Sequence, residues 1–229
     1  MIGIIGAMQS ETAALIAAMT DTSSETVSGV TYTKGILEGK EVVVATSGIG
    51  KVFAAVCAQT MILCYAPSLL INTGVAGTLT TALSVGDVAV ASSLVQHDMD
   101  TSPLGDPVGL VSGINKIYFD ADGRAVEAFC ACVQAEGGKS VVGTVASGDQ
   151  FIASPEKKKA IVERFCAVAC EMEGAAIAHV AFINGTPFAV LRAISDSADG
   201  EASMDYPTFV KLAAARSVAV LRRYVREFA

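Results

Sequence analysis

Short apolar runs of strand length alternate along this chain with longer segments in which apolar residues recur at helical spacing. Strands are expected at residues 2–7, 31–37, 40–46, 69–73, 86–95, 140–147, 167–170 and 187–194. Helices are expected over about ten residues after a cap at Ser10, at 51–65, 122–136, 173–184 and 206–227, and after a cap at Ser154 with Pro155 in the first turn. The periodicity is lost at 96–116, which is therefore the longest expected loop.

The regular exchange of strand and helix predicts an α/β protein, specifically a three-layer α/β/α sandwich around a central mixed sheet. Neither an internal repeat nor a linker rich in Pro, Gly or Ser divides the sequence. We therefore expect a single domain over residues 1–229. The composition agrees, because 52% hydrophobic and only 17% charged residues suit a sheet covered by helices on both faces.

Composition and charge exclude several classes of partner. The most apolar stretch, residues 61–71, is broken by Pro67 and Ser68 well short of the roughly 20 residues that span a membrane. The N-terminus lacks the basic flank of a signal peptide, so we expect a soluble, cytoplasmic protein with no membrane partner. A net charge of −7 argues against nucleic-acid binding, and the basic run 157–159 is interpreted as a solvated helix face.

The sequence offers little for metal or disulfide chemistry. Six cysteines form no C-x-x-C pair, and His97 and His179 lie far apart without flanking cysteines. We expect no metal site, no cofactor and no disulfide framework, and we interpret the cysteines as small apolar residues.

Carboxylates stand where expected strands give way to helices. Glu11 follows the first strand, Glu171 and Glu173 flank Met172, and Asp196 ends an apolar strand. Such strand ends are where α/β enzymes gather their acid and base groups. Because almost no histidine is available, the pattern predicts an enzyme that cleaves a bond in an organic substrate with Asp and Glu.

Three glycine-bearing motifs are weaker signals. Residues 3–6 lack the complete dinucleotide fingerprint, and residues 47–51 do not complete a nucleotide-triphosphate loop. The latter could still present backbone N–H groups to a small anion or water. Residues 72–77 could let a ligand approach the backbone, and a plain tight turn explains them about equally well.

Six motifs occur in order between Gly6 and Asp196. They are Gly6-Ala7-Met8 with Glu11, Ser47-Gly48-Ile49-Gly50-Lys51, Asn72-Thr73-Gly74 with Ala76-Gly77, Ser147-Gly148-Asp149 with Phe151-Ile152, Glu171-Met172-Glu173, and Arg192-Ala193-Ile194-Ser195-Asp196. Together they resemble the bacterial methylthioadenosine/S-adenosylhomocysteine nucleosidases of the nucleoside phosphorylase-like superfamily. The resemblance implies hydrolysis of the N-glycosidic bond of these two nucleosides, with release of adenine and the thioribose in methionine salvage.

The resemblance also implies roles for particular residues. Glu11 matches the group that activates the attacking water, Asp196 the acid at adenine N7, and Glu173 the group on the ribose hydroxyls. Asp196 must then stay protonated near neutral pH, which burial at the end of an apolar strand would favour. The other substrate-binding residues that it implies are Met8, Ile49, Val75, Phe151, Ile152, Met172, Ser195, Ala198, Tyr206 and Phe209.

The chain departs from the family pattern at three places. Val75 and Thr78 replace a frequent Ser and Gly, Gln9 replaces a frequent acidic residue, and the loop 96–112 diverges after its His-Asp-x-Asp start. Since the family uses this loop to cap the 5′-alkylthio group, substrate preference stays open. We also expect a homodimer, because the chain is unusually apolar for its size and a twofold arrangement is the commonest closed assembly. The resemblance adds that this loop reaches the partner's pocket, and the helix 51–65 is expected to supply much of the interface.

Three alternatives stay open. A purine nucleoside phosphorylase on the same fold would need arginines for phosphate, and none stands near Gly48 or Gly74 in the sequence, so hydrolysis is favoured. A non-catalytic nucleoside-binding protein would not need Glu11, Glu173 and Asp196 together. An aminodeoxyfutalosine nucleosidase is not separated from the main interpretation by these motifs.

Overall fold

A ten-stranded mixed sheet forms the centre of the computed structural model, which describes residues 1–196 and 206–229, with the backbone alone at 206–208 and 210. Its strands are β1 (Ile2–Gly6), β2 (Thr20–Val27), β3 (Val30–Leu37), β4 (Lys40–Thr46), β5 (Leu69–Thr78), β6 (Val88–Gln96), β7 (Tyr118–Asp120), β8 (Ser140–Ser147), β9 (Ala167–Glu171) and β10 (Phe188–Asp196). The order β10-β6-β8-β9-β5-β1-β4-β3-β2 is supplemented by a β10–β5 pairing, so five of these strands form a closed ring.

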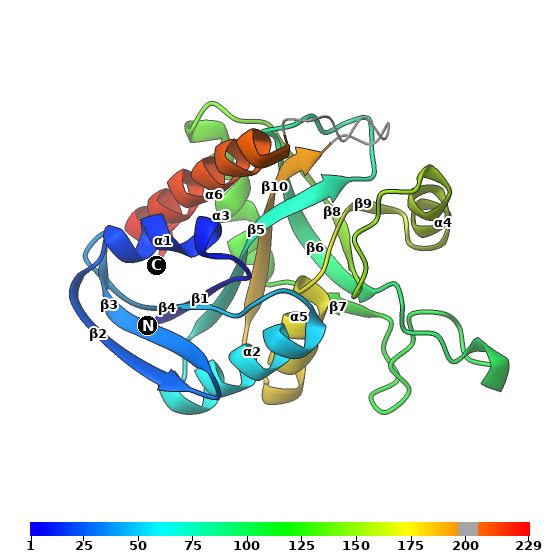
Figure 1. The fold of residues 1–229 in the computed structure, drawn as a ribbon, viewed down its shortest axis with the longest axis horizontal. Coiled ribbons are helices and arrows are strands. Elements are labelled where there is room, and N and C mark those ends of the chain that lie inside the picture. The colour runs from blue at the N-terminus through cyan, green and yellow to red at the C-terminus, as the bar shows by residue number, and fades with distance from the viewer. Residues whose placement is uncertain (197–205) are drawn as a thin grey trace.

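Helices cover both faces of the sheet (Figure 1). They are α1 (Gln9–Ala17), α2 (Lys51–Tyr65), α3 (Gly123–Ala135), α4 (Pro155–Phe165), α5 (Gly174–Asn184) and α6 (Tyr206–Phe228), with a 3-10 turn at Ser102–Leu104. One apolar cluster joins the sheet to α2 and α5, and a second joins it to α1, α3 and α6. The predicted α/β/α layering with a mixed sheet is therefore confirmed.

The strand registers bring the sequence motifs to one edge of the sheet. β1 and β10 both run parallel to β5, with Asn72 opposite Ile5 on one side and Val190 on the other. β8 runs parallel to β6 and β9, which sets Ser147 beside Glu171. Parallel strands end at the same edge, so the motifs converge within each of these two groups. The antiparallel β5–β9 pairing, which sets Gly77 opposite Cys170, brings the strand ends of the two groups together.

Five features of the structure differ from the sequence prediction. α1 begins before Ser10, because its N-cap is Met8. The Met8 N–H group donates a hydrogen bond to the Glu11 carboxylate at 2.9 Å. β2 was missed because it is an exposed polar edge strand, and β7 because it is very short. β5 continues to Thr78 instead of stopping at 73. In the run 157–159 the middle lysine is buried.

No helix in the part of the chain that the structure describes is both long and apolar enough to cross a membrane.

Candidate active site

A pocket opens where β1, β5, β9 and β10 end. It is lined by Ala7, Met8, Glu11, Ile49, Val75, Ala76, Gly77, Gln150, Phe151, Ile152, Cys170, Glu171, Met172, Glu173, Ser195 and Asp196. Most of the residues proposed from the sequence are thus brought together. Phe209, half-buried on α6, is not among the lining residues, and Ala198 and the Tyr206 side chain lie outside the described residues.

Glu11 is buried and rigidly held. Its Oε2 accepts hydrogen bonds from the backbone N–H groups of Ala7 and Met8 at 2.7 and 2.9 Å, and its Oε1 accepts one from Val75 at 3.1 Å. The carboxylate is thus oriented by the turn between β1 and α1 and by β5. Because Val75 contributes through its backbone, the replacement of a frequent Ser at this position leaves that bond intact.

Gly74 explains why a small residue is needed in the segment 72–77. A Cβ atom placed there would collide with the Arg192 guanidinium and with the Glu11 carboxylate. The strand pairing sets Arg192 directly opposite Gly74. Of the two interpretations of this segment, close approach to the backbone is the one that the structure supports, although the approaching groups are the protein's own.

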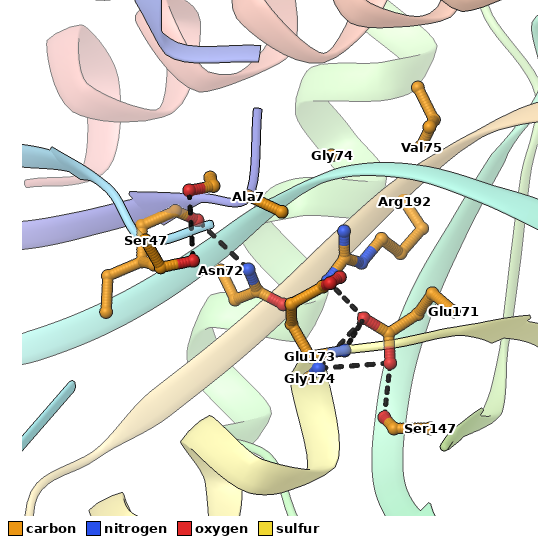
Figure 2. A network of polar contacts seen from close by, with 12 residues as sticks. Ala7, Ser47, Asn72, Gly74, Val75, Ser147, Glu171, Glu173, Gly174 and Arg192 are labelled. Carbon is orange, nitrogen blue, oxygen red and sulfur yellow. Dashed lines mark hydrogen bonds and ion pairs between the residues drawn. The ribbon is translucent and has the colours of Figure 1, made fainter. Parts of the chain in front are cut away.

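A buried cation joins two of the carboxylates (Figure 2). The Arg192 side chain is 1% exposed, and its Nη2 donates to Glu171 and to the side-chain oxygen of Asn72. The same nitrogen lies 3.6 Å from Glu173 Oε2. Glu171 also accepts from the Ser147 hydroxyl and from the N–H groups of Glu173 and Gly174. With so many partners, Glu171 is an anchor of the site.

Glu173 receives the backbone N–H group that the segment 47–51 was expected to offer to an anion. Gly50, whose φ of 100° suits glycine, donates to Glu173 Oε1 at 2.9 Å. The next N–H, of Lys51, donates to Asp149 at 2.8 Å. Burial first, and the nearby Glu171 carboxylate second, raise the pKa of Glu173 to about 7.

Asp196 stands at the end of β10 in a mostly apolar setting. Burial raises its pKa, as expected from the sequence, while the hydrogen bond from Ser195 and the positive charge of Lys158 act in the opposite direction. The Ser195 hydroxyl donates to Oδ1 at 3.1 Å. A Cβ atom at Gly77 would lie 2.8 Å from Oδ2, so the glycine makes room for the carboxyl.

Sequence reasoning gave no role to Arg192 and treated the absence of arginine near Gly74 as a fact about the site. In the folded protein an arginine does lie near Gly74, because the β5–β10 pairing sets Arg192 beside it. The premise is therefore wrong. The available signal was a charged residue inside an otherwise apolar strand, which requires a buried partner.

The arrangement can perform acid–base cleavage. It offers a fixed carboxylate acceptor at Glu11, a buried acid with raised pKa at Asp196, and a third carboxyl at Glu173, beside an apolar lining that includes Met8, Ile152 and Met172. Among the described residues, no cluster of three or more His, Cys, Asp or Glu side chains could hold a metal ion.

This fold and pocket define a protein of the phosphorylase superfamily, whose family model matches residues 1–226. The chain is 41% identical over 210 residues to a 5'-methylthioadenosine/S-adenosylhomocysteine nucleosidase of Shewanella sp. (strain MR-7), covering 91% of this chain and 89% of that protein. A relative of the same name from Shewanella loihica is 42% identical over 211 residues, with 91% of each covered.

Solved structures agree. The nucleosidase of Neisseria meningitidis in complex with methylthio-immucillin-A has a TM-score of 0.94 at 37% identity and covers 99% of both chains. The native futalosine hydrolase of Helicobacter pylori has a TM-score of 0.93 at 36% identity, covering 99% of this chain and 97% of that one. The chain belongs to the 5'-methylthioadenosine/S-adenosylhomocysteine nucleosidase family.

Proposed function

We propose that this protein hydrolyses the N-glycosidic bond of 5'-methylthioadenosine and S-adenosylhomocysteine, releasing adenine and the thioribose. The observation that carries the proposal is the convergence of Glu11, Glu173 and Asp196, from three separate elements, on one partly apolar pocket. The names of its relatives from Shewanella and Neisseria point to the same reaction.

The proposed roles follow from how each carboxyl is held. Breaking the bond leaves positive charge on the ribose and negative charge on the departing base. Asp196, with its raised pKa, donates a proton to adenine N7. Glu11 is anchored by three backbone N–H groups and orients and deprotonates the attacking water. Glu173 accepts from the ribose hydroxyls.

The remaining lining residues would shape the pocket around the substrate. Phe151 and Ile152 serve as the adenine platform, and Met8 and Met172 border the ribose and its 5′ substituent. Ile49, Val75 and Ser195 complete the described part of this lining. Ala198, Tyr206 and Phe209 remain proposed contacts from the family resemblance.

Hydrolysis is favoured over phosphorolysis by the charge around the pocket. Arg192 is the buried arginine at this edge, and it is already paired with Glu171, Asn72 and Glu173. A phosphate dianion near Glu11 would therefore face carboxylates without a free guanidinium to bind it. Water carries no such penalty.

Aminodeoxyfutalosine is a second candidate substrate. It is favoured by the structural match to the Helicobacter pylori futalosine hydrolase, with a TM-score of 0.93. Both substrates would use the same carboxyl groups, so the choice concerns only the group that the 5′ side of the pocket accepts.

We also propose that residues 1–229 form one domain that acts as a homodimer. Exposed apolar side chains gather on neighbouring helices: Val52, Val56 and Leu63 on α2, and Phe182 and Ile183 on α5. Exposed apolar surface of this extent on a soluble protein usually marks a contact. Two members of loop 96–112, Pro103 and Leu104, are exposed and free to reach a partner.

The test is adenine release by the pure protein from methylthioadenosine, S-adenosylhomocysteine, adenosine and aminodeoxyfutalosine, without phosphate. We expect turnover of the first two. The sugar product should be free methylthioribose from methylthioadenosine and S-ribosylhomocysteine from S-adenosylhomocysteine. Asp196→Asn should lower turnover by at least ~10²-fold, the usual contribution of general acid catalysis. Glu11→Gln should abolish hydrolysis while an inhibitor still binds. Formation of a ribose 1-phosphate, or near wild-type rates in either variant, would contradict the proposal.

A further inference from the structure

The middle lysine of the run 157–159 lies inside the protein. Lys157 and Lys159 are exposed, whereas the Lys158 side chain is only 8% exposed. It stands on the buried face of α4, in line with Ile161 and Phe165. Lysine is rarely buried without a charged partner, because removing an ammonium group from water is unfavourable. The solvated helix face predicted for this run is therefore wrong at Lys158.

One charged partner of Lys158 is the Asp196 carboxyl. Lys158 Nζ lies 3.9 Å from Asp196 Oδ2, and the Asp196 side chain is 11% exposed. This separation is within the range of an ion pair but is longer than a hydrogen bond. The ammonium group therefore acts on the carboxyl through its charge, while Asp196 still lines the pocket.

The other elements around Asp196 bring neutral groups. Ser195 on β10 donates its hydroxyl hydrogen bond, and Gly77 on β5 has no side chain. Cys170 on β9 also lines the pocket, and burial raises the pKa of its thiol to about 12, so it is uncharged. Glu171, next on β9, is paired with Arg192. Among the described residues, Lys158 is the charged group that faces the Asp196 carboxyl.

We propose that Lys158 is a positioning residue that makes Asp196 a stronger acid, by stabilising the carboxylate that remains once the proton has left. The inference rests on the proposed hydrolysis. In that step the Asp196 O–H bond breaks and an N7–H bond forms on adenine, while the O–H electron pair stays on the carboxylate. The C1′–N9 electron pair passes into the purine, and water adds to C1′ as Glu11 takes its proton.

The physical consequence is a balance between two pH-dependent properties. An opposite charge within about 4–6 Å typically lowers an aspartate pKa by about 1–3 units. Lys158 therefore promotes proton donation to the leaving base, and it narrows the pH range over which Asp196 holds its proton. Burial acts in the opposite direction, so the pKa of Asp196 reflects the balance of the two effects.

The direct test is the titration of Asp196 in the free protein, followed by carboxyl ¹³C NMR. Its resonance is the one that disappears in Asp196→Asn. In Lys158→Met we expect the midpoint to rise by about 1 pH unit or more. Lys158→Arg, which keeps the charge, should restore most of the wild-type value. Lys159→Met, an exposed neighbour on the same helix, is the matched control and should leave the midpoint unchanged.

Turnover gives the second measurement. A one-unit weaker acid, with proton transfer about half complete, should lower the plateau kcat by about threefold and shift its alkaline limb to higher pH. Circular dichroism would verify that Lys158→Met is folded. An unchanged Asp196 midpoint in this folded variant, or an equal shift in Lys159→Met, would overturn the proposal. Because the titration needs no substrate, failure of the wild type to release adenine would be recognised separately as failure of the proposed reaction.

Discussion

At the scale of single residues, the pocket is organised by buried charge. Three charged side chains are nearly inaccessible to solvent: Arg192, Glu171 and Glu173. Burying any one of these charges without a partner would be strongly unfavourable for folding. Arg192 allows two carboxylates to lie side by side, so its removal should affect folding as well as chemistry. The site is thus a set of mutually dependent ions.

The first consequence concerns stability. Arg192→Met should lower the free energy of unfolding by about 3–5 kcal/mol, because it leaves two buried carboxyls without their cation. Urea denaturation would measure the loss. Arg222→Met is the matched control: its ion pair with Glu38 is at the surface, and its loss should change stability by about 1 kcal/mol at most. An Arg192 effect no larger than the control would mean that the network contributes little.

The raised pKa of Glu173 predicts how binding depends on pH. Below about 7 the carboxyl is protonated, and above it the carboxylate can accept from two ribose hydroxyls. Binding of methylthioadenosine to Asp196→Asn should therefore tighten as pH rises through about 7. We expect roughly fivefold, from the ~1 kcal/mol advantage of hydrogen bonds to charged acceptors.

Adenine, which lacks the ribose, is the control ligand, and calorimetry should show no such step for it. The same pKa has the opposite effect on the free protein. The folded state binds a proton that the unfolded chain has lost, so this contribution to stability is complete below 4.5 and disappears as pH rises through about 7. A flat pH dependence for methylthioadenosine would contradict the assigned role.

At the scale of elements, the sequence predicted the strands and helices that have clear periodicity. The carboxyl groups at strand ends were found because their position follows from the pattern alone. β2 could not be found in this way, since its exposed face and its polar residues leave no alternation to detect. The start of α1 was misplaced because its cap is completed by Glu11, a residue that also serves the pocket.

Contacts between elements were less predictable than the elements. The β5–β10 register decides that Arg192 meets Gly74, and the orientation of α4 decides that one lysine of three points inward. Both depend on tertiary packing of segments that are distant in sequence. Family resemblance supplied roles for individual residues, but the partners of those residues became visible only in the folded chain.

At the scale of the whole molecule, exposed apolar side chains are concentrated on one face of the protein. Helices α2 and α5 lie side by side on the same side of the sheet (Figure 1), and both carry exposed apolar side chains. The segment between β6 and β7 projects away from the sheet (Figure 1). Leu104, in the 3-10 turn of this segment, is exposed. A second copy of the chain would cover both features in the commonest closed assembly, a twofold dimer.

The residue chosen to test this dimer must come from the exposed side of α2. Met61 is in the helix 51–65 but is fully buried against β1, so a charge there would disrupt the core instead of an interface. Val52, at 74% exposure, is the better site. Val52→Glu should weaken dimerisation by about tenfold or more, since burial of a charge at an apolar contact costs well over 1.4 kcal/mol.

Leu212→Glu is the matched control, because Leu212 is similarly exposed but lies on α6, across the sheet from α2. Analytical ultracentrifugation over a concentration series would give the dissociation constants, with adenine release measured at the same concentrations. If the loop 96–112 of one chain completes the pocket of its partner, activity in Val52→Glu should fall with the dimer population and recover at high protein concentration. An active wild-type monomer at assay concentration would show that each pocket is complete within its own chain.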